Sequence, residues 1–182
     1  MSLGFGAISE SPISALPDTF VAEMPPLAPE QRESLIQVVS FLDSRLIDHY
    51  RANPNELRLM DRRQFEELVA ELFSGFGYTV ELTKRTRDGG KDIIAVRRGE
   101  VDVRYLIECK RPDPKNSIGV STVRELLGVK VDDGTMKAIL ATTGYFTKDA
   151  RDFVEKHRWE LEARDFDAIK DWLARYALIK GQ

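Results

Sequence analysis

The chain has 182 residues, 42% of them hydrophobic and 31% charged, a balance typical of a globular protein with one sizeable core. No run approaches the ~18 apolar residues that a membrane span needs, and no secretion signal opens the chain, so we expect no membrane partner. The single cysteine, Cys109, excludes an intrachain disulfide and fits a reducing compartment, so we expect a cytoplasmic protein.

The charge is unevenly distributed along the chain. The net charge of -3 alone would argue mildly against a nucleic-acid-binding protein. Between Lys84 and Lys115, however, ten basic and six acidic residues give a local charge of +4. Because DNA responds to the local field rather than to the total charge, a DNA partner is compatible with this composition.

The first 55 residues are predicted to precede the main domain. Residues 1–29 should form an irregular arm, because five prolines interrupt regular elements there. Apolar residues at helical spacing predict a helix over residues 30–52, which Asn53-Pro54-Asn55 ends. Its apolar stripe is wider than the usual arc of about 100°, so we expect it to be buried on two sides, against its own domain and against a second copy in a homodimer.

The main domain, residues 56–182, is predicted to begin with a helix and a three-stranded meander. Asp61 and Gln64 have the spacing of a capping box at the start of the helix, and the glycines at 75 and 77 end it. Residues 78–83, 92–96 and 101–110 have the composition of strands, and Arg97-Arg98-Gly99-Glu100 is a hairpin signal between the last two.

The remaining segments alternate between helices and strands. We predict helices over residues 121–131, 147–156 and 167–178, the second of them capped by Thr147, and strands over 138–142 and 159–163. This order predicts an α/β fold in which a mixed β-sheet is flanked by helices.

The hairpin brings three charged residues together. Asp92 and Glu108 are equidistant from position 100 in the predicted turn, so they should lie opposite each other on antiparallel strands, with Cβ atoms about 5 Å apart. Lys110 shares that face, whereas Cys109 points into the core. The two carboxylates and the lysine should therefore lie within reach of a single cation.

This arrangement suits a hard divalent cation, namely Mg²⁺, for which Mn²⁺ can substitute. The cation would polarise a phosphodiester and activate water, and Lys110 could orient that water or stabilise developing charge. Each fragment alone is more often a turn or a solvated strand. Their combination at the end of a mostly buried strand favours a functional site, because unpaired charges are seldom buried.

Several separated motifs occur in order along the chain. They are Gln64-Phe65-Glu66, Gly77-Tyr78-x-Val80, Asp88-Gly89-Gly90-x-Asp92-Ile93, Ile107-Glu108-Cys109-Lys110-Arg111, the segment Ile118–Gly128, and Thr142-Thr-Gly-Tyr-Phe-Thr147 followed by Ala150. Together they resemble the Mrr-type restriction endonuclease catalytic domain, a family of the PD-(D/E)xK nuclease superfamily, over about residues 59–175. The resemblance implies a restriction-endonuclease-like fold and cleavage of double-stranded DNA with Mg²⁺.

By matching positions, the resemblance implies that Asp92 and Glu108 hold the metal and that Lys110 is the catalytic lysine. The family also has an acidic residue on its first core helix, and this residue corresponds to Glu66. Helical geometry supports Glu66 over Glu67, because Glu66 borders the apolar face. The alternative for Glu66 is an ordinary charge on the helix rim.

Other residues near the site are candidates for DNA contacts. Basic residues could follow the DNA backbone, and the helix N-terminus near Ser121 and the turn at Thr143 could bind phosphate. For any single one of these residues, a solvated charge or a plain turn is the alternative. The basic candidates are Lys84, Arg85, Arg87, Lys91 and Arg111.

The sequence therefore predicts a metal-dependent DNA endonuclease, a restriction enzyme of the Mrr-like type IV kind. The alternatives are another nuclease of the superfamily, such as a Holliday-junction resolvase, and a nuclease fold used only to bind DNA or protein. A nucleotide-binding protein is disfavoured, because Gly89 and Gly90 precede a strand rather than a helix. Residues 1–55 are too short for the separate DNA-reading domain that family members often carry, which leaves the source of specificity open.

Overall fold

Six strands form one mixed sheet at the centre of the protein. The computed structural model describes residues 35–36, 44–83, 91–113 and 115–181. The order of the strands in the sheet, β1-β2-β3-β4-β5-β6, is the same as their order in the chain. Strands β1 to β4 pair antiparallel with their neighbours, whereas β4, β5 and β6 pair parallel. The strands are β1 (Leu35–Ile36), β2 (Thr79–Thr83), β3 (Ile93–Arg97), β4 (Val103–Lys110), β5 (Lys137–Thr142) and β6 (Leu161–Arg164).

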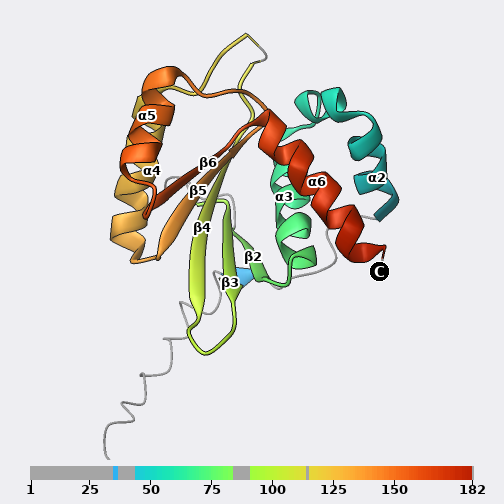
Figure 1. Ribbon diagram of the computed structural model, residues 1–182, viewed down its shortest axis with the longest axis horizontal. Helices are drawn as coiled ribbons and strands as arrows, with labels where there is room; N and C mark the ends of the chain where they lie inside the picture. The colour runs from blue at the N-terminus through green and yellow to red at the C-terminus, as the bar shows by residue number, and fades with distance from the viewer. Residues whose placement is uncertain (1–34, 37–43, 84–90, 114, 182) are drawn as a thin grey trace, which may run out of the picture.

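Helices cover both faces of the sheet (Figure 1). On one face lie α3 (Arg62–Gly75) and α6 (Phe166–Lys180), and on the other lie α4 (Val120–Asp133) and α5 (Lys148–Lys156). The helix α2 (Ser44–Ala52) packs against α6, and the short 3-10 helix η1 (Pro54–Arg58) follows it. The predicted mixed sheet flanked by helices is therefore confirmed.

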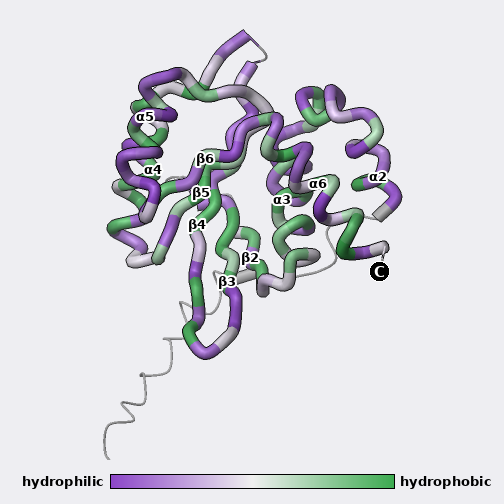
Figure 2. The backbone as a smooth tube through the Cα atoms, viewed as in Figure 1, coloured by the Kyte–Doolittle hydropathy of each residue, from purple (hydrophilic) through white to green (hydrophobic). Residues whose placement is uncertain are grey.

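Each face of the sheet has its own apolar core. Because side chains alternate between the faces of a strand, Ile107 and Cys109 of β4 pack with α3 and α6, whereas Leu106 packs with α4 and α5. Figure 2 shows the hydrophobic stretches that run along the central strands. None of the helices in the described part of the chain has the length and the apolar character required to cross a membrane.

The predicted start of α3 is confirmed in detail. Asp61 accepts a hydrogen bond from the Gln64 N–H over 2.9 Å, and the Gln64 side chain accepts one from the Asp61 N–H over 3.2 Å. This capping box satisfies two backbone donors that would otherwise have no partner within the helix. After the helix, Gly77 has a φ of 88°, a left-handed conformation that glycine adopts without steric cost.

The helix predicted over residues 30–52 is wrong in its first part. Among the described residues of that range, the helix covers Ser44–Ala52, whereas Leu35 and Ile36 form β1 and pair with Thr83 and Leu82 of β2. The physical reason is that β2 offers unpaired backbone groups at the sheet edge, which an apolar dipeptide can satisfy. The arm predicted over residues 1–29 lies outside the described residues.

The other elements differ from their predictions mainly at their ends. Strand β4 begins at Val103 rather than at residue 101, because the hairpin turn is longer and is closed by an ion pair of 2.5 Å between Arg98 and Asp102. Helix α6 begins at Phe166, since Asp165 caps it by accepting a hydrogen bond from the Ala168 N–H.

Candidate active site

Strands β3 and β4 bring Asp92 and Glu108 to the same end of the sheet. Ile93 pairs with Ile107 in a register that places Asp92, the residue before β3, opposite Glu108. The Asp92 N–H continues this ladder by donating to the Ile107 carbonyl over 3.2 Å. The predicted symmetry about position 100 is therefore confirmed.

Cys109, between Glu108 and Lys110, is fully buried, as predicted. Burial raises the pKa of its thiol well above the usual value, and the nearby carboxylate of Asp92 adds to the shift. The group therefore stays a neutral thiol and contributes packing. Its backbone N–H donates a hydrogen bond to Asp92.

Three carboxylates are buried at this end of the sheet. The exposed fractions of Glu66, Glu108 and Asp92 are 3%, 5% and 8%. An ionised carboxylate is costly to bury unless it is paired and hydrogen-bonded. The partners of these three groups consequently decide what the site can do.

Asp92 is held from two directions. Its Oδ2 accepts a hydrogen bond of 2.7 Å from the Cys109 N–H, and its Oδ1 lies 2.9 Å from Nη2 of Arg62. Both partners are hydrogen-bond donors, and each of them holds one oxygen of the carboxylate in place. The carboxylate is thus oriented by the backbone of β4 and by a cation from α3.

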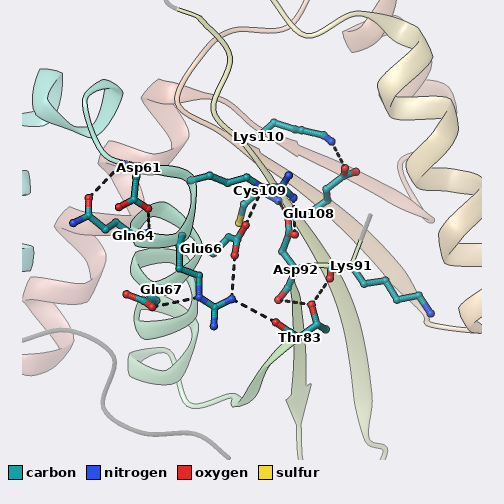
Figure 3. Close-up of polar contacts among 12 residues, drawn as sticks. Asp61, Gln64, Glu66, Glu67, Thr83, Lys91, Asp92, Glu108, Cys109 and Lys110 are labelled. Atoms are coloured by element: carbon teal, nitrogen blue, oxygen red, sulfur yellow. Dashed lines mark hydrogen bonds and ion pairs between the residues drawn. The ribbon is translucent and has the colours of Figure 1, made fainter. Parts of the chain in front are cut away.

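Arg62 also reaches Glu66 on its own helix. Its Nε lies 2.9 Å from Glu66 Oε1, and Nη1 of Arg63 lies 3.2 Å from Glu66 Oε2. Figure 3 shows Glu66 on α3 facing the strand end that carries Asp92. Burial lowers the pKa of Arg62, but pairing with Asp92 and Glu66 raises it more, so the net shift is upward and the guanidinium stays charged.

Glu108 has a different partner. Figure 3 shows Glu108 and Lys110 pointing toward one another, and their charged groups lie 2.5 Å apart. Burial raises the pKa of Glu108, although the hydrogen bond from Lys110 opposes the shift. Lys110 is more accessible, with a side chain that is 35% exposed, so its ammonium can meet an incoming group.

The chemistry of this donor set fits a hard divalent cation. Buried carboxylate oxygens are the ligands that Mg²⁺ prefers, and Asp92 and Glu108 are the residues that would hold it. Among the described residues, no three His, Cys, Asp or Glu side chains are grouped closely enough to hold an ion. Asp92 pairs with Arg62, whereas Glu108 pairs with Lys110. A single cation shared by both carboxylates stays a prediction.

Comparison with known proteins decides the family. The profile of Mrr_cat, described as a restriction endonuclease, matches residues 57–173. This chain belongs to the Mrr_cat restriction endonuclease family. The resemblance inferred from the separated motifs is thereby confirmed.

Two longer proteins are similar to this chain. The uncharacterized protein y4cE of Sinorhizobium fredii (strain NBRC 101917 / NGR234) is 32% identical over 134 residues, which cover 71% of this chain and 34% of y4cE. The DNA modification-dependent restriction endonuclease AspBHI has the same fold, with a TM-score of 0.53 and 21% identity over 82% of this chain and 41% of its own. The chain therefore spans about a third of the curated relative and less than half of AspBHI.

The residues predicted to contact DNA differ in their exposure and in their partners. Arg111 is exposed beside Lys110, and Ser121 is exposed in the first turn of α4. Lys91 forms an ion pair with Asp133, and Thr143 is buried, with its N–H donating to the Lys110 carbonyl over 3.3 Å. Lys84, Arg85 and Arg87 lie outside the described residues. As DNA contacts, all of these residues stay predictions.

Sequence reasoning missed three arginines near this Mrr_cat site. Arg62 and its neighbour Arg63 occupy the first turn of α3, where the helix macrodipole disfavours basic residues. That mismatch was a signal that at least one of them serves another purpose. The other missed residue, Arg58, has its guanidinium 4.2 Å from the ring centroid of Phe166. Only the tertiary structure brings Arg58 and Phe166 together.

Proposed function

We propose that this chain is the catalytic domain of a metal-dependent DNA endonuclease, a restriction enzyme of the Mrr-like type IV kind that hydrolyses phosphodiester bonds of double-stranded DNA. The observation that carries the proposal is the placement of Asp92 opposite Glu108, with Lys110 two residues further on, at the ends of two adjacent buried strands. Membership of the Mrr_cat family supports it independently.

The environment of each residue indicates its role in the proposed reaction. Mg²⁺, or Mn²⁺ in its place, supplies a Lewis acid and an activated water molecule when bound. Asp92 is ready to act as a ligand because the Cys109 N–H already orients its carboxylate. Lys110 can turn its accessible ammonium from Glu108 toward a phosphate oxygen, where it stabilises the charge that develops during hydrolysis.

Exposed groups at the same end of the sheet suit a phosphate backbone. Arg111 follows Lys110 directly and donates to the Arg58 carbonyl over 3.2 Å. Tyr145, which is 42% exposed, lies close to Arg58, with 5.7 Å between the Arg58 guanidinium and the Tyr145 ring centroid. Arginine and tyrosine are frequent donors to DNA phosphates. We infer that DNA approaches the carboxyl ends of β4 and β5.

The decisive experiment is cleavage by the full chain with Mg²⁺ or Mn²⁺. Methylated plasmid, unmethylated plasmid and a four-way junction are incubated with wild type, Lys110→Ala and Lys115→Ala. Lys115 is an exposed lysine of the same basic stretch and is not one of the proposed active-site residues, so its removal changes the charge equally. We expect wild type and Lys115→Ala to cut plasmid and Lys110→Ala to bind but not cut.

The products distinguish the alternatives. Preference for methylated plasmid supports the type IV assignment, whereas resolution of the junction alone supports a junction resolvase. DNA binding without metal-dependent cleavage of any substrate would show a binding module on a nuclease fold. Full activity of Lys110→Ala would leave the nuclease standing but contradict this active site.

A further inference from the structure

Arg62 lies where a cation would be needed between two buried carboxylates. Its guanidinium contacts Glu66 through Nε and Asp92 through Nη2, each over 2.9 Å. The arginine side chain is 52% exposed, whereas those of Glu66 and Asp92 are 3% and 10% exposed. A half-exposed cation thus pairs with two buried carboxylates.

The contact involves the oxygen of Asp92 that is open to a ligand. Oδ2 is bound to the Cys109 N–H inside the strand pair, so Oδ1 is the oxygen directed toward Arg62. A divalent cation held by Asp92 would compete with the Arg62 Nη2 group for Oδ1. Charge repulsion opposes the binding of both cations to this oxygen together.

We propose that Arg62 is a positioning residue that occupies the metal side of Asp92 and leaves this carboxylate when a divalent cation binds. The inference rests on the proposed function, because it concerns the same metal site. Arg62 then has two opposite effects. It stabilises the metal-free protein by pairing buried charges, and it weakens cation binding because the cation must displace it.

Arg63 provides a matched control on the same helix turn. It contacts Glu66 over 3.2 Å and Glu67 over 3.3 Å, and its described contacts do not include Asp92. Replacing either arginine with glutamine removes one positive charge from the first turn of α3. A difference between the two variants therefore reports the contact with Asp92 rather than the general field.

The test is Mn²⁺ binding to the full chain without DNA, measured by calorimetry and by the electron paramagnetic resonance signal of free Mn²⁺. We expect Arg62→Gln to lower the Kd by about tenfold or more relative to wild type, since one charge-assisted contact no longer competes. Arg63→Gln should lower it much less. Asp92→Asn should bind Mn²⁺ weakly, which verifies the location of the site.

Thermal unfolding gives a second readout. Without metal, Arg62→Gln should melt below Arg63→Gln, because Asp92 and Glu66 lose a shared partner. Saturating Mn²⁺ should raise the Tm of Arg62→Gln by more than that of wild type, because ligand stabilisation grows with affinity. If Arg62→Gln does not fold, Arg62→Lys takes its place. Its ammonium keeps the charge but cannot span two carboxylates as a planar guanidinium does, so it should also bind Mn²⁺ more tightly than wild type.

The outcomes separate the two proposals. If wild type binds Mn²⁺ at Asp92 but neither Arg62 variant binds it more tightly than Arg63→Gln, the role of Arg62 is overturned and the proposed function stands. If neither wild type nor any variant binds Mn²⁺, both are overturned.

Discussion

Helix α3 carries two buried carboxylates that serve different ends of the molecule. Glu66 lies near the strand ends and contacts the guanidinium groups of Arg62 and Arg63. Glu71, which is 7% exposed, accepts a hydrogen bond of 2.8 Å from the Tyr176 hydroxyl of α6. The burial of the two residues is similar, so burial alone does not distinguish the carboxylate near the strand ends from the one between the helices. The two carboxylates differ in the nature of their partners.

The partners differ in whether they can be exchanged. A surface arginine can leave Glu66 for solvent or for a phosphate. Tyr176 is locked between helices, and a Cβ atom added to Gly75 would come within 2.2 Å of its ring. Burial and the hydrogen bond to Glu71 raise the pKa of Tyr176, so the hydroxyl stays neutral and donates. The pair of Glu71 and Tyr176 therefore joins α3 to α6.

The largest expected effect lies at the strand ends. Lys110→Ala should lower the single-turnover cleavage rate by about 10²–10³, because a group that stabilises transition-state charge is lost. Tyr176→Phe, at the other end of the comparison, should cleave at the wild-type rate at a temperature where it is folded. Equal losses of activity in the two variants would remove the distinction between the strand ends and the contact of α6 with α3.

The free energy of unfolding should depend on Tyr176 more than on Lys110, the reverse of the order expected for activity. Tyr176→Phe should lower the free energy of unfolding by about 1–3 kcal/mol, because a buried carboxylate loses a hydrogen-bond donor. Urea denaturation followed by circular dichroism measures the change. Arg175→Gln, an exposed neighbour on α6, serves as a control for general effects of substitution. A Tyr176→Phe variant as stable as this control would show that the hydroxyl contributes nothing.

The pH dependence of the metal-free protein tests the environment of Glu108. Its pKa is raised above the ordinary 4.5 by burial, so the native state holds this proton more tightly than the unfolded chain. The contribution of Glu108 to stability must then fall as the pH rises from about 4.5 through the raised pKa. Glu108→Gln cannot titrate, so at neutral pH it should gain stability relative to wild type.

Urea midpoints across this pH range, measured in the presence of a chelator, give the comparison. Subtracting the stability of wild type from that of Glu108→Gln cancels the contributions of all other groups. This difference in stability should increase with pH. If the difference instead decreases as the pH rises, the pairing with Lys110 outweighs the burial of Glu108.

The smallest expected effect concerns the exposed surface beside the site. DNA affinity should fall steeply with salt, and Arg111→Ala should reduce the log–log slope by roughly 0.9, the value for one phosphate contact. Fluorescence anisotropy at several salt concentrations measures the slope. Arg158→Ala removes an exposed arginine that follows α5, outside the strand ends of the site, and should leave the slope unchanged. Equal slopes for wild type and Arg111→Ala would exclude Arg111 as a phosphate contact.

Several features of the site could be read from sequence because they depend on neighbouring residues. The pairing of Asp92 with Glu108 follows from a single hairpin, whose alternation and turn lie within about twenty residues. The capping box at Asp61 and the burial of Cys109 are equally local. Helical periodicity also distinguished Glu66 from Glu67, and the structure confirms that Glu66 is buried whereas Glu67 is partly exposed.

The features that were missed depend on contacts between distant segments. Strand β1 forms because the edge of β2 is available, and helical spacing in residues 30–52 contains no information about that edge. The contact of Arg62 with Asp92 joins residues 30 positions apart, and that of Tyr176 with Glu71 joins residues 105 positions apart.

The sequence by itself determined the order of the elements from α3 onward, the register of the hairpin and the types of residue that meet at the strand ends, because hydrogen-bonding patterns and apolar periodicity act over short stretches of chain. Only the tertiary structure decided which charge neutralises each buried carboxylate. Ion pairs depend on distance in space and on burial, and both are set by how α3 and α6 pack on the finished sheet. The identity of these partners also distinguishes the carboxylates at the strand ends, where we propose a metal site, from the one that joins α3 to α6.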